Sequence, residues 1–322
     1  MKRMIIGRSI TTLAISLLLA YVSVCAQQGA PPVGREYKLQ TLYRASIAQS
    51  YEFVEQTTVE RTYRDSTRST YARMAKYFMT VRCIESLDGV SKVVVNLDSL
   101  QYKFTSGGQE ISYDSQKDIT PKNFADLNNY IGPLNRSFEL TYSPYGEVTS
   151  VSGEQIDFWR EYLEQNASDL DSVLYTIWTQ SLSKENLLHV GDLQKRTIPG
   201  LRRAVDSSWS HKLALRIDGT LYNGNVRSRL ASYEGGLYHI ITQDTLTANP
   251  DQTVHTYNVP VLATVLDGTM TTNSTVLLST AGTINEFTSI SKGILHLQAG
   301  REPITQSITS TMQWKLLGQY QW

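Results

Sequence analysis

Two long regions of the chain alternate between apolar and polar residues, which is typical of strands with one buried face. In residues 37–153 the pattern is clearest at 93–97, where the sequence reads Val-Val-Val-Asn-Leu. In residues 209–322 it is clearest at 213–217, which reads Leu-Ala-Leu-Arg-Ile. Gly pairs and Asn-Gly steps between such segments indicate tight turns. The pattern predicts a mainly β, β-rich α+β fold with two antiparallel β lobes.

A helical insert separates the two β regions, at residues 154–189. Apolar residues such as Ile156, Trp159 and Leu163 recur there at the spacing of one helix face. A polar break at 166–168 divides the segment into two or three helices. At this spacing a Trp is a core residue far more often than a ligand platform, so we assign no site to the insert.

Proline, glycine and charged residues predict the structure of three further segments. Thr120-Pro121 predicts the start of a short helix, which ends at Gly132-Pro133. Residues 190–208 are basic and loop-like, and we expect them to form a connector before the second lobe. Residues 254–266 have a strand pattern, but Pro260 restricts that strand to an edge or a bulge.

Two predicted hairpins share a pattern. Residues 140–148 and 276–284 both read apolar-x-x-Ser-x-x-Gly-x-apolar, which describes a strand, a turn and a returning strand. Glycine at the turn provides a positive φ at little cost. One such match leaves open whether the two β lobes arose by duplication.

The N-terminus has the form of a secretory signal peptide. Lys2, Arg3 and Arg8 precede the apolar run Ile10–Val24, and small residues lead to the Ala26–Gln27 bond. The run covers 15 residues, fewer than the roughly 20 needed to span a bilayer. We therefore expect cleavage between Ala26 and Gln27.

Lipid attachment at Cys25 is the alternative for this terminus. The β-branched Val24 before the cysteine fits a lipoprotein site poorly, so we favour a signal peptide at 1–26. A flexible leader follows at 27–36. After signal removal we expect an exported protein of the periplasm or the extracellular space, without a transmembrane segment.

Composition excludes one large class of function. The 322 residues, enough for about two domains, contain 30 basic and 30 acidic residues. Removing the signal leaves 27 basic and 30 acidic groups, a formal charge of −3. A nucleic-acid-binding protein needs a basic surface to neutralise phosphates, so we expect no nucleic-acid partner.

The metal-binding residue types are scattered along the chain. None of the five histidines stands two or four residues from another, so no strand or helix face presents a pair. They are His189, His211, His239, His255 and His296. Cys83 is the single cysteine after signal removal, and apolar neighbours predict that it is buried. We expect no metal site and no cofactor.

Catalytic motifs are weak. Ser-x-x-Lys occurs at Ser181/Lys184 and at Ser289/Lys292, a spacing that on a helix places a lysine beside a serine. The companion motifs of penicillin-recognising enzymes are missing, so we assign no catalytic residue. A glycoside hydrolase uses two carboxylates, but a pair such as Asp169/Asp171 is no evidence for one in a chain with 30 acidic residues.

One basic cluster stands out in the mature chain, formed by Lys195-Arg196 and Arg202-Arg203. Such a cluster can contact anionic lipid head groups or an acidic partner. A solvated connector between two lobes is the more common role, and it is the one we predict.

Several short motifs together resemble a family of exported Gram-negative bacterial proteins whose domain has no assigned function. The residues are the Ser143–Val148 turn, Gly153 before a helix with Ile156, Val190-Gly191-Asp192, and Ser207-Ser208-Trp209. In that family the Trp follows the Gly-Asp closely, whereas Trp209 lies farther downstream. The resemblance implies a two-lobed β-rich secreted protein and no activity.

Three functions remain open. The first is non-enzymatic binding of an amphipathic, lipid-like ligand or of an envelope protein, for which Tyr-rich walls are suited. The second is an assembly module that uses a strand edge. The third is a hydrolase whose site assembles only in three dimensions.

Overall fold

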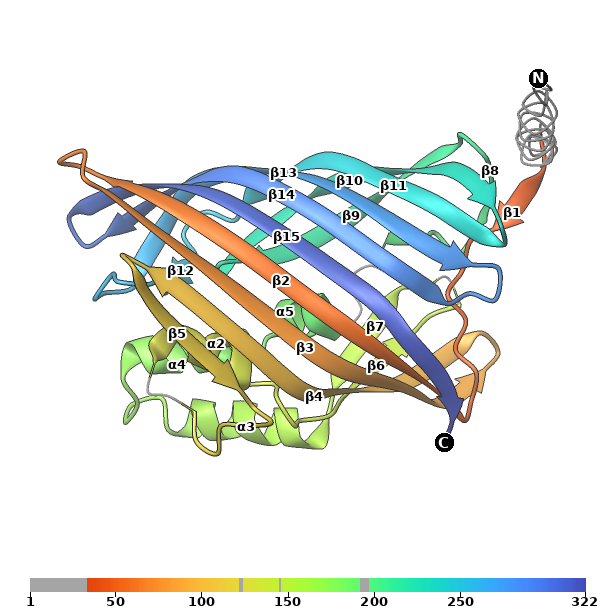
Figure 1. The fold of residues 1–322 in the computed structure, drawn as a ribbon, viewed down its shortest axis with the longest axis horizontal. Coiled ribbons are helices and arrows are strands. Elements are labelled where there is room, and N and C mark those ends of the chain that lie inside the picture. Colours follow the sequence, from red (N-terminus) through yellow and green to blue (C-terminus); the bar gives the residue numbers. More distant parts are fainter. Residues whose placement is uncertain (1–33, 122–123, 145, 192–196) are drawn as a thin grey trace, which may run out of the picture.

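Nearly all strands of the molecule join one antiparallel sheet of 13 strands (Figure 1). The computed structural model describes residues 34–121, 124–144, 146–191 and 197–322. The sheet contains β2 (Ile47–Tyr63), β3 (Arg68–Leu87), β4 (Val90–Ser106), β5 (Gln109–Asp114), β6 (Phe138–Tyr142), β7 (Val148–Ser152), β9 (Ser208–Ile217), β10 (Thr220–Glu234), β11 (Leu237–Ala248), β12 (Thr253–Val254), β13 (Ala263–Ser279), β14 (Ile284–Ala299) and β15 (Glu302–Gln321). Two short strands, β1 (Glu36–Lys38) and β8 (Arg202–Ala204), pair separately. The predicted mainly β, antiparallel fold is confirmed.

The pairing of β2 with β15 joins the two β regions of the sequence. The strand order is β7-β6-β4-β3-β2-β15-β14-β13-β11-β10-β9, so each region supplies one half of the sheet. The β2–β15 ladder runs from Tyr63 opposite Ile304 to Ile47 opposite Gln321. Residues 241 to 274 positions apart therefore become direct neighbours, and β7 and β9 are left as the two edges.

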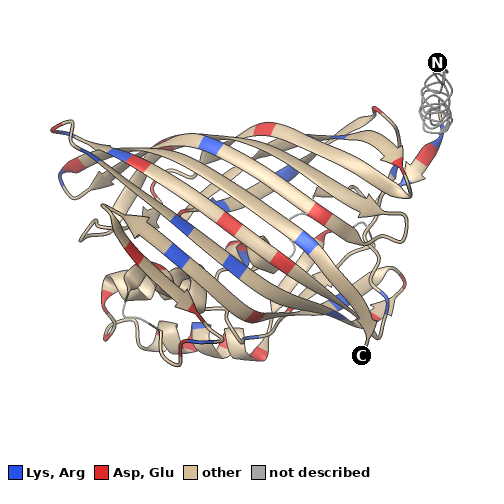
Figure 2. Cartoon of the chain, in the orientation of Figure 1, with Lys and Arg blue, Asp and Glu red and all other residues tan. Residues whose placement is uncertain are grey.

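One face of the sheet is buried and the other faces solvent. On β3, Tyr71, Arg73 and Tyr77 point inward and are buried, whereas Lys76 points outward and pairs with Glu52 at 2.6 Å. This alternation is the period of two that a pleated strand imposes. Figure 2 shows charged residues of both signs spread over the outer face.

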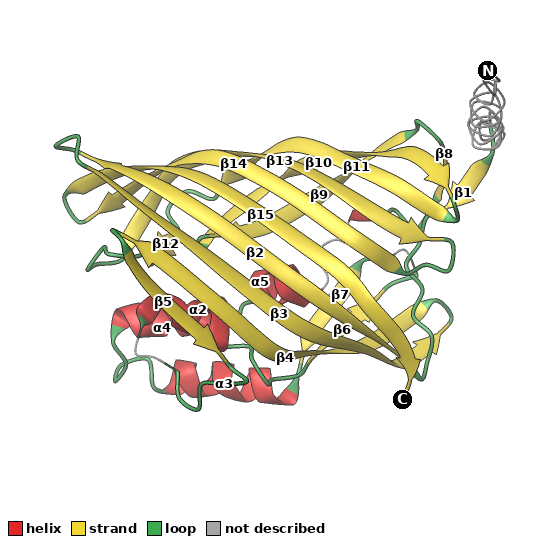
Figure 3. Ribbon diagram, viewed as in Figure 1, coloured by secondary structure: helices red, strands yellow, loops and turns green. Residues whose placement is uncertain are grey.

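In the part of the chain that the structure describes, four helices lie on the inner side of the sheet (Figure 3). They are α2 (Ala125–Ile131), α3 (Glu154–Gln165), α4 (Ser172–Ser181) and α5 (Lys184–Gly191). The last of them contacts both edge strands, β7 and β9, so it occupies part of the space between the two edges. None of the helices in the described part is long and apolar enough to cross a membrane.

The two hairpins with the shared pattern form the same turn. Gly146 N–H donates to Ser143 O and Gly282 N–H donates to Ser279 O, each at 2.9 Å. The glycine φ angles are +82° and +81°, a region that glycine adopts far more readily than other residues. The pattern therefore encodes this turn.

Two local predictions are wrong. The helix after Pro121 begins only at Ala125, because Phe124 has an extended backbone (φ −139°, ψ 114°). The strand expected at 254–266 is interrupted, since Val259 N–H donates to Thr256 O in a turn just before Pro260. Strand β12 ends before this turn and β13 begins after it.

Several predictions concern residues outside the described part. The signal peptide at 1–26, Cys25, the Ala26–Gln27 cleavage site and most of the leader at 27–36 lie there. Lys195-Arg196 of the basic cluster lies there as well. These assignments stay predictions.

Candidate ligand-binding pocket

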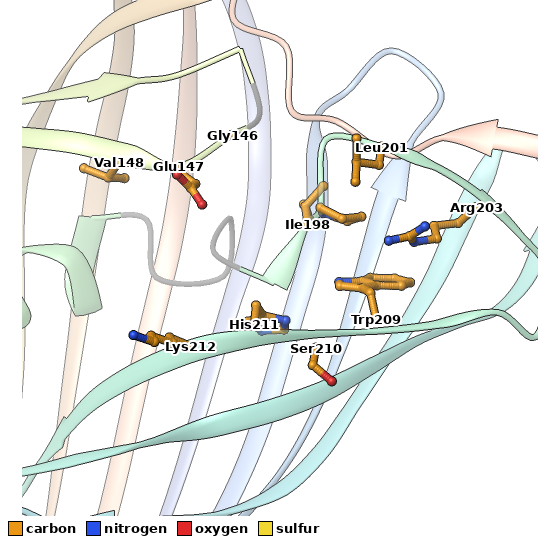
Figure 4. A pocket seen from close by; sticks show the side chains of 11 residues that line it. Gly146, Glu147, Val148, Ile198, Leu201, Arg203, Trp209, Ser210, His211 and Lys212 are labelled. Carbon is orange, nitrogen blue, oxygen red and sulfur yellow. The ribbon is translucent and has the colours of Figure 1, made fainter.

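A pocket of about 500 Å³ lies between the edge strands β7 and β9 (Figure 4). Its walls come from the turn that leads into β7, from the segment before β9, and from β9 itself. The lining residues are Gly146, Glu147, Val148, Ile198, Pro199, Leu201, Arg203, Trp209, Ser210, His211 and Lys212. Small-molecule sites commonly have volumes of about 300–1,000 Å³, so this pocket has the size of a ligand site.

Trp209 forms an aromatic wall of the pocket. Alternation on β9 buries its side chain while Ser210 and Lys212 are exposed. The indole Nε1–H donates to Thr197 O at 3.1 Å, which fixes the ring and uses its only polar group. Trp209 therefore offers a rigid apolar face.

Arg203 lies over this face with an incomplete set of partners. Its guanidinium carbon is 5.8 Å from the centre of the Trp209 ring, within range of a cation–π contact. Its Nη1 makes a long hydrogen bond of 3.4 Å to Arg202 O, while its Nε is buried and has no partner. No described acidic residue forms an ion pair with Arg203.

His211 points into the middle of the pocket (Figure 4). Both of its ring nitrogens are buried and have no partner. Burial lowers the pKa of His211 to about 4, so the ring is neutral near pH 7. A neutral imidazole donates one hydrogen bond and accepts one, and both capacities are unused here.

The remaining charges of the pocket nearly cancel. Lys212 and Glu147 are both exposed at its rim. With His211 neutral, Arg203 leaves the described lining residues with one excess positive charge. The arrangement combines apolar walls with hydrogen-bonding groups that lack partners, which suits an amphipathic ligand.

The basic cluster was the sequence signal closest to this pocket. Arg203 lines it, but its neighbour Arg202 is exposed and does not. Both belong to β8, which pairs with β1, so this part of the predicted connector is a strand. No local pattern separates Arg203 from Arg202, because their difference depends on which one faces Trp209.

The two Ser-x-x-Lys motifs do not form catalytic pairs. Ser181 is buried and its hydroxyl donates to Trp178 O at 2.9 Å, while Lys184 is exposed. Ser289 is buried on the inner face of β14, and Lys292, three residues later on the same strand, is exposed on the outer face. An odd spacing on a strand places the two side chains on opposite faces.

The other metal-binding residue types are dispersed as well. His296 pairs with Asp267 at 2.6 Å on the surface, and His189 lies deep in the core. Cys83 is buried, and its thiol contacts Glu85 O at 3.4 Å. In the part of the chain that the structure describes, no three His, Cys, Asp or Glu residues are grouped as a metal would require.

A second polar region lies inside the sheet, which we call the Arg73 network. Arg73 on β3 pairs with Asp218 and, at 3.4 Å, with Asp126 of α2. Its Nη1 donates to the Tyr130 hydroxyl at 2.9 Å. The other members, also buried, are Glu55, Arg61, Tyr71, Tyr102 and His189.

The Arg73 network fixes helices to the sheet. The Tyr102 hydroxyl donates to Asp126 at 2.5 Å, which holds α2. Glu55 on β2 contacts His189 of α5 at 3.2 Å. Burial acts against ionisation of Glu55, but the bond to His189 and the charges of His189 and Arg73 lower its pKa.

The Arg73 network leaves little free space. The adjoining cavity measures about 40 Å³, room for roughly one or two waters. Burial raises the pKa of Asp218 despite the nearby Arg73 and Arg61 charges. Tyr71, which donates to Asp218 at 2.8 Å, is also buried. The network is therefore a packed part of the core.

Sequence patterns did not reveal the Arg73 network. Asp218 and Gly219 form the two-residue turn between β9 and β10, with φ angles of 50° and 76°. Asp-Gly is a strong hairpin signal, so the sequence explains this aspartate as a turn residue. Its contact with Arg73 spans 145 positions and leaves no local pattern.

Comparison with solved structures gives only remote similarity. A lipovitellin structure described by its lipid–protein interactions has a TM-score of 0.47 and 8% identity, covering 87% of this chain. This chain spans about a quarter, 26%, of that protein. OmpF of Salmonella typhi in complex with daunomycin has a TM-score of 0.20 at 7% identity, covering 82% of this chain and 97% of that one. OpdQ of Pseudomonas aeruginosa has a TM-score of 0.22 at 5% identity, covering 84% and 99%.

Comparison of the amino-acid sequence with models of protein families identifies a family for this chain. No curated protein matches the chain. The model of a family of unknown function, DUF6263, matches residues 88–281, a segment that runs from the β3–β4 turn to the β13–β14 turn and contains every residue of the pocket. The match covers more than half of the chain, and it confirms the predicted membership in a family without an assigned function. The chain belongs to the DUF6263 family.

Proposed function

We propose that this protein binds an amphipathic small molecule, without catalysis, in the pocket between β7 and β9. One observation carries the proposal: the apolar side chains of Ile198, Leu201 and Trp209 lie beside polar atoms of Arg203 and His211 that have no partner. Buried polar atoms normally have partners. A ligand that fills the pocket would provide them.

The hydrolase alternative has less support. Acidic and imidazole groups do converge in the Arg73 network, as a hydrolase would need, but the cavity beside them is about 40 Å³. A substrate does not fit in that volume. Glu55 and His189 are instead paired with each other at 3.2 Å in the core.

We also propose that the protein acts after export, in the periplasm or outside the cell. The basic start, the apolar run at 10–24 and the small residues before Gln27 support this. The native protein should then begin at Gln27. A native chain that begins at Met1 would contradict export by this signal.

Native mass spectrometry on protein purified gently from its own cells tests the binding proposal. We expect an extra mass of a few hundred daltons that is lost on denaturation. His211→Trp places a large side chain in the middle of the pocket and should abolish this mass. Thr58→Trp on the exposed face of β2 is the matched control and should retain it. A bare chain in both wild type and control would refute the proposal.

A strand-edge partner is the second candidate, and one observation favours it. In the described sheet β9 pairs on one side only, with β10, so its other edge has backbone groups available for a further strand. The same mass spectrum separates the two functions, because a protein partner adds kilodaltons. An added chain in place of a small molecule would favour strand addition.

A further inference from the structure

We propose that the ligand of this pocket is an anionic amphiphile whose acidic head group binds Arg203 and His211 and whose apolar part contacts Trp209 and Leu201. This inference rests on the proposed function and specifies the class of ligand. The head group is a carboxylate or a phosphate ester, both of which present oxygen acceptors with negative charge.

The incomplete coordination of Arg203 is the first step of the argument. A guanidinium has five N–H donors and no acceptor, and here Nε is buried without a partner while Nη1 makes one long bond. A partly buried cation without a counter-ion is unfavourable. An acceptor oxygen with negative charge supplies both missing interactions, and Arg binds carboxylate and phosphate particularly well.

The local charges favour an anion over a cation. Lys212 at the rim of the pocket is positive and offsets Glu147, so no described lining residue compensates the charge of Arg203. Figure 4 shows Glu147 on the side of the pocket away from Arg203. The carboxylate of Glu147 is therefore not placed to fill the role of the ligand.

His211 adds a second donor without a second charge. Its ring is neutral near pH 7 because burial lowers its pKa to about 4. One ring N–H is therefore available to a head-group oxygen, and the unprotonated nitrogen can accept from a hydroxyl. The presence of one donor and one acceptor on the same ring favours an oxygen-rich head group over a bare hydrocarbon.

The apolar walls define the rest of the ligand. Val148, Ile198, Pro199 and Leu201 line the pocket together with the ring of Trp209. Hydrocarbon in contact with these side chains is removed from water, at a gain of about 25 cal/mol per Å². A head group alone would leave these contacts unused, so we expect the chain length of the ligand to contribute to affinity.

Isothermal titration calorimetry with four matched probes tests the inference. The probes are sodium dodecanoate, dodecyl phosphate, dodecan-1-ol and dodecyltrimethylammonium, each below its micelle concentration. At least one anion should bind about tenfold or more tightly than the alcohol, and the cation should bind most weakly. The stronger of the two anions then indicates the head group.

Variants of Arg203 test whether this residue causes the preference for an anionic head group. Arg203→Gln should lower the affinity for the best anion about tenfold or more and leave the alcohol unchanged. Arg203→Lys keeps the charge and should retain part of the preference for the anion. Arg202→Gln, at the exposed neighbour, is the control and should change neither. Thermal melting of each variant verifies that the fold is intact.

The results distinguish this inference from the proposed function. Equal binding of anion and alcohol, unaffected by Arg203→Gln, would overturn the anionic ligand while binding in the pocket stands. Failure of every probe, together with a bare chain in the native mass spectrum, would overturn both. Loss of affinity in the Arg202 control as large as in Arg203→Gln would also overturn the assignment.

Discussion

Arg73 lies on β3 of the large sheet and Arg203 on the short strand β8, and the surroundings of the two arginines differ. Arg73 is buried and has two carboxylates and a tyrosine hydroxyl as partners. Arg203 is half-buried and has no ion pair with any described residue. The space beside Arg73 is about 40 Å³, whereas the pocket at Arg203 measures about 500 Å³.

This difference separates a structural role from a binding role. A charge whose partners all come from the chain holds elements together, as Arg73 holds α2 against β3. A charge that lacks partners next to an open pocket has capacity for a ligand. The Nε of each arginine is buried without a hydrogen bond, so what distinguishes them is that described carboxylates pair with Arg73 and none pairs with Arg203.

Removal of the Arg73 guanidinium should have the largest effect. We expect Arg73→Met to lower the free energy of unfolding by about 3–5 kcal/mol, because Asp126 and Asp218 would stay buried without their ion-pair partner, and only Arg61 would remain near Asp218. Urea unfolding measures this loss. Lys76→Met, on the outer face of β3, is the control and should cost less than about 1 kcal/mol. Similar values for the two variants would contradict a structural role for the network.

The pocket histidine should produce a moderate, pH-dependent effect. The pKa of His211 is about 4 in the folded protein, below its ordinary value of 6.5. Between pH 6.5 and 4 the unfolded chain therefore binds a proton that the folded chain does not, so stability falls as the pH falls through this window. With allowance for the partial exposure of the ring, the contribution is about 1–2 kcal/mol.

Unfolding at pH 7 and pH 4.5 measures the contribution of His211. The His211→Gln variant should lose less stability between these two pH values than the wild type. His239→Gln on β11 controls for the loss of a histidine as such and should behave like the wild type. An equal loss in wild type and His211→Gln would show that the ring is not kept neutral by burial.

The smallest effect on folding should come from the residue most important for binding. Without ligand, Arg203→Gln should change the free energy of unfolding by no more than about 0.5 kcal/mol, since no ion pair with a described residue is lost. With dodecanoate present, the wild type should gain stability by ligand linkage and the variant should gain much less. A loss above about 1.5 kcal/mol without ligand would give Arg203 a structural role like that of Arg73.

Much of the fold followed from local patterns. Alternation located the strands around 93–97 and 213–217, and helical spacing located α3 to α5. The serine and glycine positions 143/146 and 279/282 encode two equal turns. Such features depend on neighbours in sequence, where the periods of strand and helix and the φ angle of glycine act directly.

The candidate site was only partly visible in the sequence. The basic cluster included Arg203, and Trp209 was part of the family resemblance, but nothing indicated that the two are in contact. His211 was one of five scattered histidines to which no site was assigned. It lies on an edge strand, and its side chain is half-buried at the pocket. Long-range contacts of this kind leave no periodic signal in one chain.

The sequence by itself determined which residues form strands and which side of each strand is apolar. The tertiary structure decided which strands are neighbours, through the long pairing of β2 with β15. That pairing leaves β7 and β9 as the edges, and the pocket forms between them. The physical reason is that alternation fixes the face of a side chain, whereas only the strand order and register decide which distant side chains it meets.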